Sequence, residues 1–228
     1  MFHCFSRFDW GREIPSRFHA ASKWPEIELA IAQGSDTSPG VIVIFDLEWT
    51  SWPGFQESGW KFPGKQREVI QIGAVKLVAD LQLTEKGSFN RLVQPILHPR
   101  LDDYIVELTG ITQERIDHEG RSFQEAVEEF ASFIGPDVVG VISNGRDGEV
   151  IQEICTLHDI PVPEVLQYTK DIRPSLAFEF ELPLSALDSA DLPGIVGVES
   201  DEIPHDALGD ARSVAILLRH LWRTRALR

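Results

Sequence analysis

Hydrophobic residues follow a strand-like spacing over four segments of the chain. Residues 41–47 (VIVIFDL) and 137–143 (DVVGVIS) are rich in apolar β-branched side chains, which is typical of strands buried on both faces of a sheet. Apolar and polar residues alternate over 67–78, and 89–95 shows a similar pattern. Turn residues lie between these two segments, so together with 41–47 they predict a three-stranded antiparallel meander.

After residue 99 the hydrophobic residues fall at helical spacing. Residues 101–109 place apolar side chains on one helix face, and Gly110 is expected to end that helix. The clearest helix spans 122–135, where Ser122 is a candidate N-cap and Glu125 stands at the capping-box position. Further helices are predicted at residues 25–32, 148–158 and 184–190 and from Asp206 onward, with a short strand or helix at 168–172.

The order of these elements predicts a mixed α/β fold. Antiparallel strands followed by helices that alternate with strands indicate a sheet with an antiparallel edge and parallel strands, flanked by helices. Residues 49–66 hold three Trp and two Phe with no sustained period and are expected to form a long loop. Residues 1–24 also lack a period and predict an irregular arm, which a Ser/Thr/Pro/Gly-rich linker at 35–40 joins to the first strand.

Composition narrows the class of protein. The chain has 228 residues, of which 43% are hydrophobic and 25% charged, so a disordered or collagen-like chain is excluded. Cys4 and Cys155 have no zinc-ligand spacing and are expected to be reduced thiols. Because no apolar run is long enough for a membrane span and the N-terminus lacks a signal-peptide pattern, we expect a cytoplasmic protein without a membrane partner. A net charge of −15 argues against broad binding to nucleic acid.

Four acidic side chains and one histidine stand where strands end and helices begin. Asp46 and Glu48 close the first buried strand, two residues apart and therefore on the same face. Asp147 follows the second buried strand, and Asp210 lies in the first turns of the C-terminal helix. Taken singly, such acids are more often strand ends or helix caps. His205 can approach Asp210 only if it lies on the loop before the helix, with Asp206 as N-cap.

This donor set predicts a metal site. Carboxylate oxygens from three separate elements favour hard divalent cations such as Mg²⁺ or Mn²⁺, whereas zinc would favour Cys or more His. Two such cations, about 4 Å apart, can hold a phosphodiester for hydrolysis. In that arrangement His205 would be the general base, because an imidazole exchanges protons near neutral pH.

Three motifs resemble those of a known family. The segments FDLE, SNGRD and HDALGDA are similar to the motifs of the DEDDh 3′→5′ exonucleases, and the similarity extends over about residues 41–221. The resemblance implies a ribonuclease H-like fold with a mixed five-stranded sheet. It also implies that Asp46, Glu48, Asp147 and Asp210 bind two divalent cations and that His205 is catalytic. The implied domains are an N-terminal arm and linker at 1–38 and an exonuclease domain at 39–228.

One position departs from the family pattern. Trp49 follows Glu48, where family members often have Thr or Ala, so the resemblance makes Trp49 a candidate stacking platform for the 3′-terminal nucleotide. The alternative for the other aromatic residues of 49–66 is a loop that packs on its own side chains. By the same resemblance Thr109, in ELTGIT, is expected beside the terminal sugar; the alternative is an ordinary helix C-terminus before Gly110.

The leading hypothesis is a metal-dependent exonuclease that releases nucleoside 5′-monophosphates from 3′ ends of single-stranded DNA or RNA. The alternative is a noncatalytic nucleic-acid-binding or partner-docking module on the same fold. The sequence leaves open the choice between RNA and DNA, the oligomeric state, the processivity and any protein partner. Two bound divalent cations would reverse the local field at the four carboxylates, so the charge of −15 predicts a short binding footprint and strict metal dependence.

Overall fold

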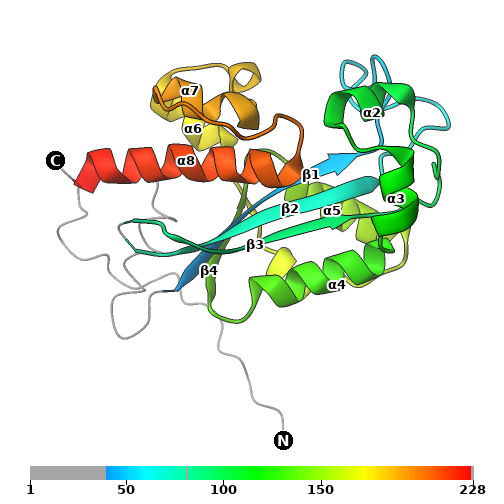
Figure 1. The fold of residues 1–228 in the computed structure, drawn as a ribbon, viewed down its shortest axis with the longest axis horizontal. Helices are drawn as coiled ribbons and strands as arrows, with labels where there is room; N and C mark the ends of the chain where they lie inside the picture. Colours follow the sequence, from blue (N-terminus) through cyan, green and yellow to red (C-terminus); the bar gives the residue numbers. More distant parts are fainter. Residues whose placement is uncertain (1–39, 81, 227–228) are drawn as a thin grey trace, which may run out of the picture.

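The computed structural model of the chain describes residues 40–80 and 82–226. The predicted arm and linker at 1–38, and the predicted helix at 25–32, lie outside the described residues. The helices and strands of the described part form the layers shown in Figure 1.

A single sheet of five strands organises the fold. Its spatial order is β3-β2-β1-β4-β5. β1 pairs antiparallel with β2, and β2 pairs antiparallel with β3, whereas β1–β4 and β4–β5 are parallel. The mixed sheet predicted from the sequence is confirmed. The strands are β1 (Val41–Trp49), β2 (Val69–Val78), β3 (Glu85–Leu92), β4 (Val138–Ser143) and β5 (Lys170–Asp171).

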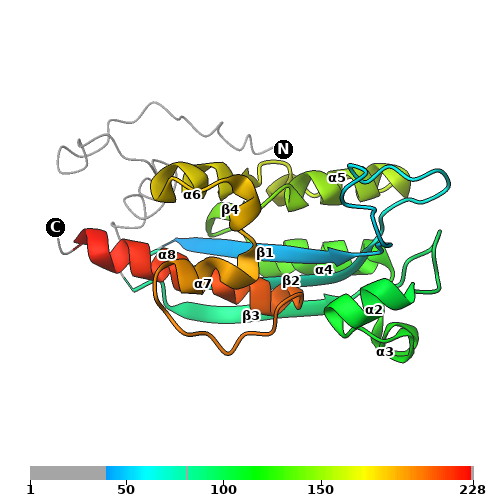
Figure 2. The same cartoon turned by 90° about the horizontal axis from the view of Figure 1, so that it is seen from above.

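Helices cover both faces of this sheet. α8 crosses one face with α6 and α7 beside it, while α4 and α5 pack on the other face (Figures 1 and 2). A third, small apolar cluster joins α2 and α3 to the sheet edge. The helices are α2 (Asp103–Thr109), α3 (Gln113–Glu119), α4 (Phe123–Ile134), α5 (Asp147–Leu157), α6 (Arg173–Phe180), α7 (Leu192–Ile195) and α8 (Ala207–Ala226).

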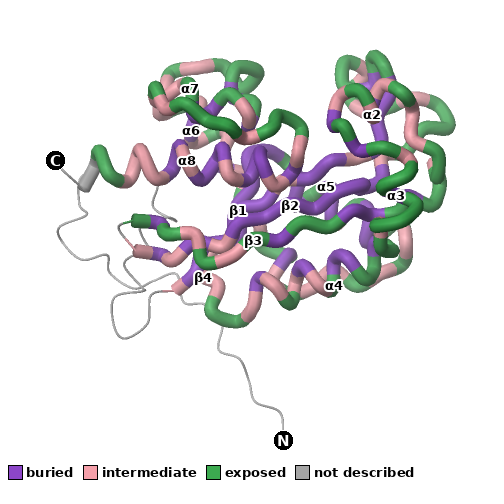
Figure 3. Tube along the Cα trace, viewed as in Figure 1, coloured by how far each residue is buried: buried purple, intermediate pink, exposed green. Residues whose placement is uncertain are grey.

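The central strand β1 is buried because both of its faces carry apolar side chains. Ile42 and Ile44 pack into the cluster under α8, and Val43 and Phe45 pack into the cluster against α4 and α5. The alternation follows from the period of two in a strand. Figure 3 shows this buried band running through the strands between the two helical layers.

Two helix ends have the geometry that the sequence predicts. The Ser122 hydroxyl accepts from the N–H of Glu125, and the Glu125 carboxylate accepts from the N–H of Ser122, which completes a capping box at the start of α4. Gly110 ends α2 in the left-handed conformation, with φ 69°.

Other elements differ from the sequence-based expectation. β3 covers Glu85–Leu92 rather than 89–95, because the turn before it is made by Asp80, whose carboxylate accepts the N–H groups of Gln82 and Leu83. The helix predicted at 184–190 is replaced by two 3₁₀ turns, Leu184–Ala186 and Ser189–Asp191, ahead of α7. The helices α3 and α6 are absent from the prediction.

Within residues 40–80 and 82–226, none of the helices has both the length and the apolar character that crossing a bilayer requires.

Candidate active site

The site begins at the carboxyl end of β1. Asp46 and Glu48 share the face of β1 that α8 covers, since Ile42 and Ile44 on that face pack under α8. Asp46 pairs in register with Gly73 of β2. A Cβ at Gly73 would lie 2.1 Å from the backbone nitrogen of Leu208. Only glycine therefore lets the first turn of α8 rest directly on β2, next to the two carboxylates.

Asp147 enters the site from the parallel side of the sheet. β4 runs parallel to β1, so the loop after β4 opens at the same edge, and Asp147 is the first residue of α5. Its carboxylate accepts from its own N–H and from that of Leu47. Gly145 has φ 143°, and a Cβ there would lie 3.3 Å from the Asp147 Oδ2. The loop thus brings Asp147 against the end of β1.

His205 and Asp210, the remaining two predicted residues, lie at the start of α8. Asp206 is the N-cap of α8, because its Oδ2 accepts from the N–H of Gly209 at 3.0 Å. His205 lies on the turn before the helix, exposed and with φ 57°, and its N–H donates to the Asp210 Oδ2 at 3.2 Å. The loop position predicted for His205 is what the structure shows.

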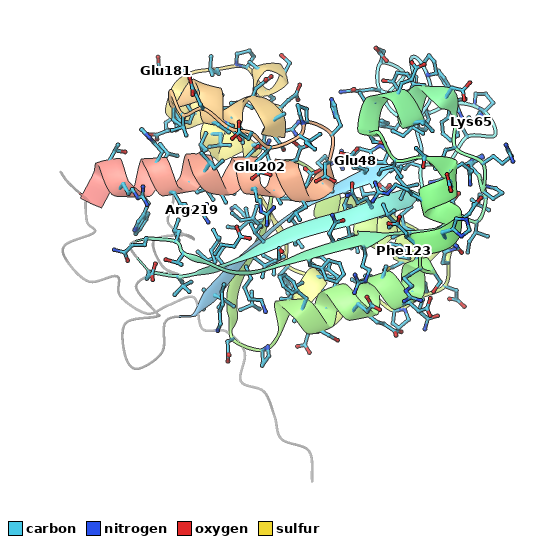
Figure 4. All side chains as sticks on the ribbon, viewed as in Figure 1. Glu48, Lys65, Phe123, Glu181, Glu202 and Arg219 are labelled. Carbon is cyan, nitrogen blue, oxygen red and sulfur yellow. The ribbon has the colours of Figure 1, made fainter. Side chains whose placement is uncertain are left out.

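These elements bring the predicted side chains together. Ligand atoms of Glu48, His205 and Asp210 all lie within 4.8 Å of one another. The Ser189 hydroxyl donates to the Asp46 Oδ1 at 3.5 Å. Figure 4 shows Glu48 at the end of β1, beside the start of α8. One edge of the sheet therefore collects acidic side chains from three separate elements and one imidazole.

Burial and mutual repulsion disfavour ionisation of the two β1 acids. Burial raises the pKa of Asp46 well above its ordinary value, and the negative charges of Asp147, Asp210 and Glu48 raise it further. Burial is also the main reason that the pKa of Glu48 is raised, followed by the charges of Asp210 and Asp147. Both carboxylates thus lack enough positive charge nearby to offset their desolvation.

The other two acids behave alike. Burial raises the pKa of Asp147 to about 6, although its backbone hydrogen bonds and Arg173 act in the opposite direction. Burial raises the pKa of Asp210 to about 7, and the N–H of His205 lowers it. The buried Oδ1 of Asp210 has no hydrogen-bond partner among the described residues. Buried oxygens without a donor are the expected state of ligands that await a cation, so the residues present fit hard divalent metals.

A family model decides the classification of this arrangement. Residues 43–218 match the RNase_T family, which is described as Exonuclease. The chain belongs to the RNase T exonuclease family. This membership confirms the resemblance to DEDDh 3′→5′ exonucleases that the sequence motifs indicated, and it makes the described part of the chain an exonuclease domain with a ribonuclease H-like fold.

Curated relatives of this exonuclease domain include two exoribonucleases. The zebrafish (Danio rerio) ERI1 exoribonuclease 2 is 26% identical over 201 residues, covering 79% of this chain and 34% of that protein. The human (Homo sapiens) 3′-5′ exoribonuclease 1 is 24% identical over 201 residues, covering 85% of this chain and 55% of that protein. The chain therefore spans between a third and about half of the length of these relatives.

A solved structure has the same fold over most of both chains. The nuclease domain of 3′hExo, described as a DEDDh family member and bound to rAMP, superimposes with a TM-score of 0.70 at 22% identity, covering 83% of this chain and 95% of that one. The cell-death related nuclease 4 (CRN-4) superimposes with a TM-score of 0.68 at 22% identity, covering 81% of this chain and 64% of that one.

Three neighbours of the site in the exonuclease domain were not predicted from the sequence. Arg173, at the start of α6, donates to the Asn144 backbone oxygen and favours ionisation of Asp46 and Asp147. The Asn144 side-chain amide donates to the Ser189 hydroxyl at 3.1 Å, which in turn donates to Asp46. These residues come from a region whose hydrophobic spacing is irregular, so no sequence signal marked them except the position of Asn144 inside SNGRD.

The structure does not bring Trp49 to the four carboxylates. A shift in register between Glu48 and Trp49 ends the regular pairing of β1, and Trp49 packs against the apolar cluster on the opposite face of the sheet. Its ring contacts Trp60 edge-on, with 5.5 Å between the centroids, and the Arg67 guanidinium lies 5.7 Å from it. Contact between this side chain and a nucleotide stays a prediction.

The loop that follows Trp49 packs on its own aromatic side chains. Phe55 is 1% exposed and lies within 5.6 Å, centroid to centroid, of each of Trp52, Trp60 and Phe62. The Lys65 ammonium lies 4.3 Å from the centre of the Trp52 ring. The alternative of a self-packed loop, weighed from the sequence, is what the structure shows.

Thr109 ends helix α2 and is buried. Its hydroxyl donates to the backbone oxygen of Ile105 at 2.8 Å and accepts from the N–H of Ile111 at 3.1 Å. Both bonds stabilise the turn at Gly110 that ends α2. A role beside the terminal sugar therefore stays a prediction that the resemblance alone supports.

A further carboxylate is buried outside the site. Glu68, which directly precedes β2, is 1% exposed, and its two oxygens accept the N–H groups of Ile96, Leu97 and His98 at 2.7, 3.0 and 2.8 Å. Three backbone donors therefore surround this charge. The bonds tie the start of β2 to the loop that precedes α2.

Proposed function

We propose that this domain is a divalent-metal-dependent 3′→5′ exonuclease that hydrolyses phosphodiester bonds at the 3′ ends of single-stranded RNA or DNA and releases nucleoside 5′-monophosphates. The observation that carries the proposal is the convergence of buried, mutually repelling carboxylates with an exposed imidazole at one edge of the sheet. The names of the curated relatives, all exoribonucleases, support RNA as the first substrate to test.

The proposal assigns the cations to the four acids. Asp46, Glu48, Asp147 and Asp210 would hold two divalent ions, Mg²⁺ or Mn²⁺, because they offer only oxygen donors. When bound, such ions would neutralise the carboxylates, polarise the scissile phosphate and lower the pKa of water. Ser189 and Arg173 support this role by fixing the Asp46 carboxylate and by adding a positive charge beside it.

His205 would act as the general base. Its imidazole is exposed on a turn, while its backbone N–H is held by Asp210, so the ring can reach a substrate without losing its anchor. In this role it takes the proton from the attacking water as the 3′-terminal phosphodiester is cleaved. Contacts of Trp49 and Thr109 with the terminal nucleotide remain predictions within this proposal.

The test is the release of mononucleotide from a 3′-labelled single strand. We expect labelled nucleoside 5′-monophosphate from linear RNA in Mg²⁺ or Mn²⁺, none in excess EDTA, and none from an internally labelled circular RNA of the same sequence, which has no 3′ end. A matched DNA strand measures the preference for the sugar. If no mononucleotide is released in Mn²⁺ with enzyme in excess, the proposal fails in favour of a noncatalytic nucleic-acid-binding module.

A cytoplasmic location is part of the proposal. Cys155 is a buried free thiol, which is the expected state in a reducing compartment. Cell fractionation against cytoplasmic and membrane markers tests it, and recovery of the protein with membranes or in the medium would contradict it.

A further inference from the structure

Gln71, on β2, connects the sheet to the start of α8. Its side chain is 1% exposed and stands opposite Glu48 in the β1–β2 register. The Nε2 atom donates to the Asp206 Oδ1 at 2.6 Å and to the Asn90 Oδ1 at 3.0 Å, and the Oε1 atom accepts from the N–H of Ala207 at 3.1 Å. Both N–H donors of this side-chain amide are used and its oxygen accepts one bond, and two of these three bonds go to the beginning of α8.

These bonds fix the residue that follows His205. The Asp206 carboxylate is shared, with one oxygen on Gln71 and the other on the N–H of Gly209 inside the helix. Asp206 can therefore neither rotate nor leave its N-cap position without leaving a buried polar group unpaired. Gln71 thus holds the helix cap from the sheet side.

His205 has a backbone conformation that needs such support. A non-glycine residue in the left-handed region, here with φ 57°, costs about 1–3 kcal/mol and persists only where its surroundings impose it. The bond from the His205 N–H to Asp210 constrains one side of the residue, and Asp206 constrains the other. Gly73, two residues beyond Gln71, leaves the space in which α8 can approach this closely.

We propose that Gln71 is a positioning residue for the reaction: by fixing Asp206 and the first N–H of α8 to the sheet, it sets where the His205 imidazole stands relative to Glu48. The inference rests on the proposed function, in which His205 is the base. It assigns a role to Gln71 and Gly73, which lie outside the three motifs that contain the carboxylates.

The first experiment removes the hydrogen bonds and keeps the volume. In Gln71→Leu, we expect kcat to fall about 100-fold with KM changed less than about threefold, since a misplaced base costs turnover rather than substrate binding. The matched control is Gln94→Leu, which removes glutamine bonds to the backbone oxygens of Ile116 and Asp117 on α3 and is expected to keep wild-type kcat.

The second experiment exchanges the two partners. Gln71→Glu alone places a carboxylate against that of Asp206 and is expected to lose turnover as Gln71→Leu does. Gln71→Glu with Asp206→Asn restores an amide–carboxylate pair of the same net charge, keeps an N-cap oxygen for Gly209, and lets Asn90 rotate to donate. We expect this pair to recover kcat to within about fivefold of wild type. Recovery would tie the loss of turnover to the bond between residues 71 and 206, and the amides of α4, measured in the next experiment, show whether the single variants stay folded.

Amide hydrogen exchange tests the hydrogen bond between Gln71 and α8 independently of activity. The N–H of Ala207, which donates to the Gln71 Oε1, is expected to exchange faster in Gln71→Leu and to regain protection in the double variant. The amides of α4 should stay unchanged. If the wild type releases no mononucleotide, the proposed function fails, but the exchange of the Ala207 amide still shows whether Gln71 holds the start of α8. Unchanged Ala207 exchange, or a double variant no better than Gln71→Glu alone, overturns the inference.

Discussion

Two places in this domain bury carboxylates, and they treat the charge in opposite ways. Glu68 is enclosed by three backbone N–H donors from residues 96–98. At the end of β1, Asp46 and Glu48 face other acids, and an oxygen of Asp210 has no donor among the described residues. A buried charge is stable where the fold supplies its partners. The acids whose charge the fold does not offset mark the place where a cation from outside belongs.

Asp46→Asn gives the largest expected effect. We expect kcat for release of mononucleotide to fall by about 1000-fold or more, because several kcal/mol of transition-state stabilisation depend on the bound ions. The free energy of unfolding without metal is expected to stay equal or rise, since one repelling charge is removed. Turnover within about tenfold of wild type would show that Asp46 does not hold the reactive cations.

His205→Ala is expected to lower kcat by about 100-fold or more. A general base gives the wild-type profile a limb that rises with pH, and the variant should lose that limb. The measurement is kcat against pH at saturating metal. A variant that keeps the same pH dependence would point to another proton acceptor.

Glu68→Gln is the change that matches Asp46→Asn, made at the buried carboxylate outside the site. It places an amide against three N–H donors, so we expect the free energy of unfolding to fall by about 2 kcal/mol, as measured with urea. Where the variant is folded, kcat and the metal requirement should equal those of wild type. A loss of metal dependence in Glu68→Gln would break the distinction between the two buried sites.

Stability without metal should fall as pH rises. The pKa values of Asp147 and Asp210 are raised in the folded state to about 6 and about 7, so above about pH 4 these two groups hold more protons in the folded protein than in the unfolded chain. The free energy of unfolding in EDTA is therefore expected to decrease between about pH 4 and 7. Mn²⁺ should remove this decrease, because cations replace the lost protons. A rise in stability over that range in EDTA would contradict the repulsion described here.

Trp49→Ala has the smallest expected effect on activity. The ring packs with Trp60 away from the carboxylates, so we expect a loss of about 2 kcal/mol in unfolding free energy and a KM for RNA within about threefold of wild type. A rise in KM of about tenfold would instead support the base stacking that the sequence suggested.

The regular strands and helices, and the helix cap and loop that depend on nearby residues, could be predicted from the sequence. The burial of β1 on both faces, the capping box of α4 and the loop position of His205 follow from local spacing and local hydrogen bonds. The acids could be grouped because the carboxyl ends of parallel strands meet at one edge.

Contacts between distant segments could not be predicted. Glu68, Gln71 and Arg173 act through partners 19 or more residues away, and nothing near them in the sequence shows these contacts. The turn before β3 depends on the Asp80 side chain, whereas Gly87 and Ser88, which lie between the predicted strand segments 67–78 and 89–95 and favour a turn by residue type, are inside β3. Trp49 lies on the same face as Phe45 and Leu47, as the alternation along β1 predicts, but spacing alone does not reveal its contact with Trp60.

The most direct test of the claim that the mutually repelling carboxylates at the end of β1 are the cation site is a calorimetric titration with Mn²⁺ at pH 8, without substrate. We expect the wild type and Glu68→Gln to bind two ions, and Asp46→Asn to lose at least one of them. Binding of Mn²⁺ by Asp46→Asn with wild-type stoichiometry and affinity, or no binding by the wild type, would contradict the account.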